Sequence, residues 1–170
     1  MSWIQTYAGK QFWPLAPKPE DLDIVDIAHS LSLQCRFNGH CREFYSVAEH
    51  SVRVSEILPP DLALWGLLHD AAEAYLSDLP KPIKQLLPAF CEAEDRLLEV
   101  ILDRFGLTWP LPEEVHEADL RLLATEARDL MAPPPEPWGL DIEPLPRAIE
   151  PWAPENAERR FLRAFEELAL

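Results

Sequence analysis

The sequence predicts an all-α domain, a bundle of about six helices with a small β-hairpin at its N-terminus. From about Leu22 onward, apolar residues recur at helical spacing, and capping residues, prolines and glycines separate segments of helical length. An apolar fraction of 48% over 170 residues is typical of one globular domain. We therefore expect a single domain over residues 1–170, with a core over 22–131, a proline-rich segment over 132–154 and a last helix over 155–168.

The charge balance narrows the range of partners. The chain has 30 acidic and 15 basic residues and a net charge of −15, which argues against nucleic-acid polymers and anionic membranes as partners. A small phosphorylated substrate needs only a few local cations or a metal, so it is not excluded. No apolar run could span a membrane, no signal-peptide pattern is found, and three cysteines without CxxC spacing indicate reduced thiols. We expect a cytoplasmic protein.

The first elements follow from turn and stripe patterns. Aromatic and polar residues around Ala8-Gly9 predict the hairpin within residues 3–13. One apolar stripe then predicts a helix over residues 22–36, and Asn38-Gly39 marks a turn after it.

The next two helices have clear boundaries. Ser46 and Glu49 form a capping box at the start of one helix, and Pro59-Pro60 end it. The following helix covers residues 61–77. Its middle is apolar on all sides, so we expect it to be central and buried.

Three helices complete the predicted bundle. One covers residues 89–105, and the next covers residues 112–131 with Pro112 in its first turn. Residues 132–154 hold eight of the 18 prolines and cannot form a regular helix. The last helix follows them.

Residues of the metal-ligand type fall on three separate predicted helices. His69-Asp70 lies in the buried helix, where a carboxylate without a partner is costly. His50 and Asp119 lie on the apolar faces of their own helices. Each residue alone is more often a core histidine or a solvated carboxylate. Together they could hold one divalent transition-metal ion, Mn, Co, Fe, Ni or Zn, and less readily Mg.

Other polar residues accompany this site. Glu73 follows His69 by four residues and Asp70 by three, so the three share a helix face. Glu73 is either placed for proton transfer beside a metal-bound water or a solvated surface glutamate. Asp78, in a Ser-Asp-Leu-Pro turn, either caps that turn or hydrogen-bonds a substrate hydroxyl. His40, in a polar loop, is either a phosphate contact or a surface histidine.

The local sequence resembles a known family. The order H…HD…D, made by His50, His69-Asp70 and Asp119, resembles the HD-domain metal-dependent phosphohydrolases. The segments VAEHS, LHDAAE and DLPKPIK look like the bacterial 5′-deoxynucleotidase subfamily, and phage dATP triphosphohydrolases share the pattern. The similarity covers about residues 22–131.

The resemblance implies a role for each matching position. The same four residues are the metal ligands, Glu73 is the catalytic glutamate and Asp78 binds the sugar 3′-hydroxyl. Arg36-Phe37 aligns, across a one-residue gap, with a family Arg-Trp pair that holds phosphate and packs near sugar or base. Lys84 matches a lysine near the phosphate path.

We therefore expect an enzyme that hydrolyses a small nucleotide with metal-activated water, in the first place a (deoxy)nucleoside 5′-monophosphate. The alternative within the family is a dNTP triphosphohydrolase. Only Arg36, Lys81 and Lys84 supply positive charge in the matched motifs, which favours fewer phosphates. The alternative of another class is a non-catalytic nucleotide or metal sensor, against which the intact Glu73 argues. Related HD proteins are often dimers, so a homodimer is among the expected states.

Overall fold

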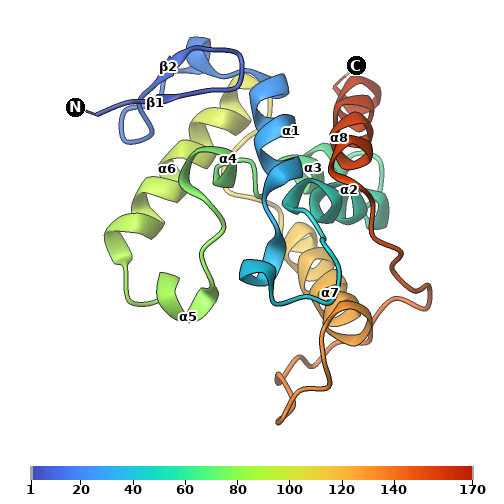
Figure 1. The fold of residues 1–170 in the computed structure, drawn as a ribbon. Helices are drawn as coiled ribbons and strands as arrows, with labels where there is room; N and C mark the ends of the chain where they lie inside the picture. The colour runs from blue at the N-terminus through green and yellow to red at the C-terminus, as the bar shows by residue number, and fades with distance from the viewer. Residues whose placement is uncertain (1, 170) are drawn as a thin grey trace.

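The structure, a computed structural model, describes residues 2–169. It is mostly helical, which confirms the predicted all-α class (Figure 1). Strands β1 (Ile4–Gln5) and β2 (Gln11–Phe12) pair antiparallel and confirm the hairpin. The remaining elements are η1 (Pro19–Asp21), α1 (Ile24–Leu33), η2 (Arg36–Gly39), α2 (Val47–Ile57), α3 (Ala63–Leu68), α4 (Glu73–Leu76), α5 (Lys81–Lys84), α6 (Pro88–Arg104), α7 (Glu113–Leu130) and α8 (Pro154–Leu168).

Helix α2 is central to the bundle, because α1, α3, α7 and α8 all pack against it (Figure 1). It begins as predicted, with the Ser46 hydroxyl accepting from the backbone N–H of Glu49 at 3.0 Å. The second half of the predicted capping box is wrong. The buried Glu49 carboxylate instead accepts from Arg53 and from the N–H of Trp152, at 2.7 Å each. It thereby attaches the chain that leads into α8 to the central helix.

The helix predicted over residues 61–77 is broken into α3 and α4. Nδ1 of His69 donates to the carbonyl of Gly66 at 2.7 Å. In a continuous helix that carbonyl would accept from the N–H of Asp70. Neighbouring N–H groups bond to carbonyls three residues back, as that of Ala71 does, so the chain tightens between the two helices.

Other boundaries differ less from the predictions. Helix α1 ends at Leu33 rather than near Arg36, because the backbone of Gln34 and Cys35 is extended. The short helix α5 was not predicted. Residues 132–153, all of them described, form neither helix nor strand, as predicted. The proline-rich segment is attached to α7 by hydrogen bonds between side chains of α7 and the backbone of the segment. These involve Thr125, Arg128 and Asp129 on α7, which bond to Leu145, Arg147 and Ile149.

The buried apolar residues form two clusters. The larger one lies among the hairpin, α1, α2, α3, α6 and α8, and it includes Phe12, Leu67 and Phe161. The smaller one lies between α2, α7 and the proline-rich segment, around Tyr45 and Leu122. None of the helices within residues 2–169 combines the length and the apolar character that a membrane span requires.

We expect Gly66→Ala to destabilise the protein by about 1–3 kcal/mol. A Cβ at this position would lie 2.5 Å from Cδ1 of Leu58 and 3.1 Å from Cα of Ser55. Because Ser55 contributes backbone, α2 and α3 must separate, and this outweighs the higher helix propensity of alanine. Chemical denaturation measures the effect, and a variant as stable as the wild type would contradict this close approach.

Candidate metal centre

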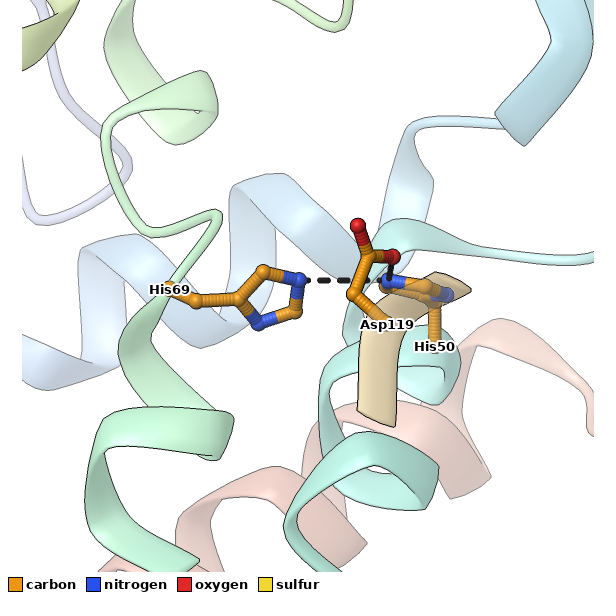
Figure 2. A group of neighbouring side chains, drawn as sticks. All are labelled: His50, His69 and Asp119. Atoms are coloured by element: carbon orange, nitrogen blue, oxygen red, sulfur yellow. Dashed lines mark hydrogen bonds and ion pairs between the residues drawn. The ribbon is translucent and has the colours of Figure 1, made fainter. Parts of the chain in front are cut away.

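The predicted ligands meet where the break after α3 faces α2 and α7, and three of them form one close group that does not include Asp70. His50 lies on α2 and Asp119 on α7, while His69 and Asp70 lie in the break. Nε2 of His50 is 3.2 Å from Nε2 of His69 and 3.1 Å from Oδ1 of Asp119 (Figure 2). The possible ligand atoms of these three residues lie within 4.8 Å of one another, so the group could hold a metal ion.

The hydrogen bonds of the two imidazole rings fit a cation between them. Nδ1 of His50 lies 2.7 Å from Oε1 of Glu126, and Nδ1 of His69 lies 2.7 Å from the carbonyl of Gly66. Both partners are acceptors, so each neutral ring carries its hydrogen on Nδ1 and leaves Nε2 with a lone pair. The two lone pairs and the carboxylate of Asp119 then face one another. A metal ion, or a proton on one of the two Nε2 atoms, satisfies such a set of acceptors, and these ligand atoms suit a transition metal.

Asp70 approaches the same point. Its Oδ2 lies 3.3 Å from Nε2 of His69 and 3.6 Å from Nε2 of His50. Ligand atoms bound to one cation at about 2.1 Å are separated by roughly 3.0–3.4 Å. Burial opposes a charge on His69, but the carboxylates of Asp70 and Asp119 together with the Gly66 carbonyl outweigh it and raise the pKa of His69 to about 9. The acidic groups therefore favour positive charge at this point.

Glu126 is a site residue that the sequence reasoning missed. It is fully buried on α7 and accepts from Nδ1 of His50, and its second oxygen lies 3.2 Å from the Arg36 guanidinium. Arg36 and His50 together hold the pKa of this carboxyl low despite its burial. Glu126 follows Asp119 by seven residues, two helical turns, so the two lie on the same face. A carboxylate at that spacing within an apolar stripe was the available signal.

Glu73 and Lys84 lie together beside the centre. Glu73 begins α4 and is buried, with Oε1 at 3.4 Å from Nζ of Lys84. Its Oε2 is buried and has no hydrogen-bond partner among the described residues. Burial, and then the charges of Asp70 and Asp78, raise the pKa of Glu73. Lys84 also bonds to Glu94 at 2.7 Å.

Arg36 and Phe37 border the centre from η2. NH1 of Arg36 lies 3.5 Å from Oδ2 of Asp70, which adds to its contact with Glu126. The Arg36 guanidinium lies 5.4 Å from the centre of the Phe37 ring, and Trp138 of the proline-rich segment lies 6.1 Å from that ring. The sequence reasoning gave Trp138 no role, because only the fold brings it to Phe37.

Two predicted site residues remain less connected. Asp78 is half-buried after α4, where its backbone N–H donates to the Gln34 side chain at 3.3 Å. His40 is exposed at the end of η2 and does not belong to the group of possible ligands. Their roles toward a substrate stay predictions.

The comparisons with known proteins identify relatives along the whole chain. The chain is 40% identical over 173 aligned positions to the uncharacterized protein YfdR of Escherichia coli strain K12, which covers 99% of this chain and 97% of YfdR. It is 37% identical over 127 positions to the uncharacterized protein RCAP_rcc00048 of Rhodobacter capsulatus, which covers 69% of this chain and 65% of that protein. No family model matches the chain. At this identity and coverage, the chain belongs to the same family as YfdR.

Proposed function

We propose that this protein is a metal-dependent phosphohydrolase of the HD-domain type, and that its substrate is a (deoxy)nucleoside 5′-monophosphate. The observation that carries the proposal is a set of converging acceptor atoms next to a buried glutamate with an unpartnered oxygen. In chain order these residues are His50, His69-Asp70, Glu73 and Asp119, which is the order of the HD pattern.

His50, His69, Asp70 and Asp119 hold the metal in this proposal. When bound, the ion supplies Lewis acidity, which lowers the pKa of water and offsets phosphate charge. Glu73 is positioned to accept the proton of the attacking water or to protonate the leaving oxygen.

The remaining residues bind and orient the nucleotide. Arg36 and Lys84 donate to phosphate oxygens as charge develops on them. Asp78 accepts a hydrogen bond from a sugar hydroxyl. Phe37, with Trp138 against it, offers an aromatic surface to the base.

The cations beside the centre favour a monophosphate over a triphosphate. Arg36 already pairs with Asp70 and Glu126, and Lys84 pairs with Glu73 and Glu94. Little positive charge therefore remains free for a triphosphate tail.

The test is a panel of deoxynucleoside mono- and triphosphates with the chelated protein, to which Mn, Co, Zn or Mg is added back. We expect inorganic phosphate from a monophosphate with a transition metal, and no product with the Asp119→Ala variant purified in parallel. Release of triphosphate would replace the proposal by the triphosphohydrolase alternative. Nucleotide binding without any product would replace it by the sensor.

A further inference from the structure

Two thiols face each other across the loop that carries Arg36. Sγ of Cys35 and Sγ of Cys41 are 3.5 Å apart, and both side chains are half-buried. The thiol of Cys41 also lies 3.8 Å from the carbonyl oxygen of Arg36, to which it donates. The third cysteine, Cys91, is also a free thiol, and its Sγ lies against the carbonyl of Lys84.

The backbone between the two cysteines holds them in this position. Phe37, Asn38 and Gly39 have positive φ values of 57°, 51° and 75°, so three successive left-handed residues turn the chain back on itself. Asn38 and Gly39 tolerate a left-handed backbone better than Phe37 does, because bulky residues rarely adopt this conformation. The turn therefore brings Cys41 to Cys35 at some conformational cost.

Both ends of the loop are attached to the body of the protein. On the entry side, Cys35 forms an antiparallel bridge with Ser46, and the N–H of Arg36 donates to the carbonyl of Tyr45 at 2.9 Å. On the exit side, the N–H of Arg42 donates to the carbonyl of Leu130 at 2.9 Å. The short separation of the sulfurs thus belongs to a fixed arrangement of the chain.

We propose that Cys35 and Cys41 form a dithiol that hydrogen peroxide oxidises to an intramolecular disulfide, which closes the loop carrying Arg36. The peroxide transfers one oxygen to the sulfur of Cys35, giving a sulfenic acid and water. The sulfur of Cys41 then attacks that of Cys35, so the S–S bond forms, the S–O bond breaks and a second water leaves. In sum, two thiols and one hydrogen peroxide give one disulfide and two waters.

The separation of the two sulfur atoms is compatible with these steps. A disulfide bond is about 2.05 Å long, so the two sulfurs must approach by roughly 1.5 Å to form it. Burial and the neighbouring Cys35 sulfur raise the pKa of Cys41 to about 11. Cys41 is therefore a thiol at neutral pH, and in the second step its proton leaves with the hydroxyl group of the sulfenic acid as water. Neither step needs a metal or a nucleotide.

The test treats the reduced, chelated protein with a small excess of hydrogen peroxide. We expect the three free thiols to fall to one and the mass to drop by about 2 Da, the two hydrogens lost. Trypsin cleaves after Arg36, between the two cysteines. Without reductant the digest should therefore contain the peptide ending at Arg36 linked to the peptide from Phe37 to Arg42. Amide exchange over residues 36–41 should slow on oxidation, and dithiothreitol should reverse every change.

Matched variants distinguish a disulfide between Cys35 and Cys41 from unspecific oxidation of cysteines. Cys91→Ser should form the same linked peptides, whereas Cys41→Ser should stop at a sulfenic acid on Cys35 that dimedone traps. Sulfinic acid on Cys35 and Cys41 in the wild-type protein, or a disulfide that includes Cys91, would overturn the proposal.

Discussion

Replacing Glu73 by glutamine should lower the turnover of the nucleotide substrate by roughly 10²–10⁴-fold, the usual contribution of a positioned general acid or base. Glutamine keeps the size of the side chain and an oxygen for Lys84, which lies 3.4 Å from Oε1 of Glu73. It cannot accept or release the proton of the reaction. Steady-state kinetics measures the loss, and elemental analysis should find the metal content unchanged, because Glu73 is not among the proposed ligands.

Glu94→Gln is the matched control for this prediction. Glu94 lies 2.7 Å from the ammonium group of Lys84. The substitution therefore removes a charged partner of Lys84 and leaves the buried carboxyl of Glu73 in place. We expect Glu94→Gln to retain most of the turnover. If both variants lost activity equally, the role of Glu73 would be to hold Lys84 rather than to move a proton.

Residues near one another in the sequence, or repeated at helical spacing, were predictable. The four proposed ligands were found from their inward-facing positions on apolar stripes, together with the resemblance of their order in the chain to the HD-domain pattern. The hairpin and the start of α2 followed from local turn and capping signals, which depend on few residues.

Two kinds of feature were not predictable: those in which a side chain competes with the backbone for a hydrogen bond, and those that depend on contacts between residues far apart in the sequence. The apolar pattern over residues 61–77 favours a continuous helix. The ring of His69 instead bonds to the carbonyl of Gly66, and the helix is interrupted there. Glu126 has the spacing of a ligand on the face of Asp119, yet only the fold shows that it contacts His50 and Arg36. Trp138 meets Phe37 across about 100 residues of chain, and no local pattern marks such a contact.

Asp119→Ala should abolish stoichiometric metal binding while leaving the fold intact. The Asp119 side chain is 31% exposed and lies on α7, where alanine is a good helix former, so its removal leaves no buried cavity. It removes the carboxylate that lies 3.1 Å from Nε2 of His50, and the remaining acceptors have one charge less with which to hold a cation. Elemental analysis of the purified variant measures the loss of metal directly.

Thermal unfolding gives a second readout that does not depend on any substrate. A ligand that binds only the folded state raises the melting temperature, so adding Mn or Zn to the chelated wild type should raise it, whereas chelated Asp119→Ala should not respond. Glu117→Ala is the matched control, because it removes an exposed carboxylate of the same helix two residues away. It should bind metal and respond as the wild type does. If Asp119→Ala kept a full complement of metal and the same thermal shift, Asp119 would not be a ligand, and the cluster would have to hold its cation through His50, His69 and Asp70.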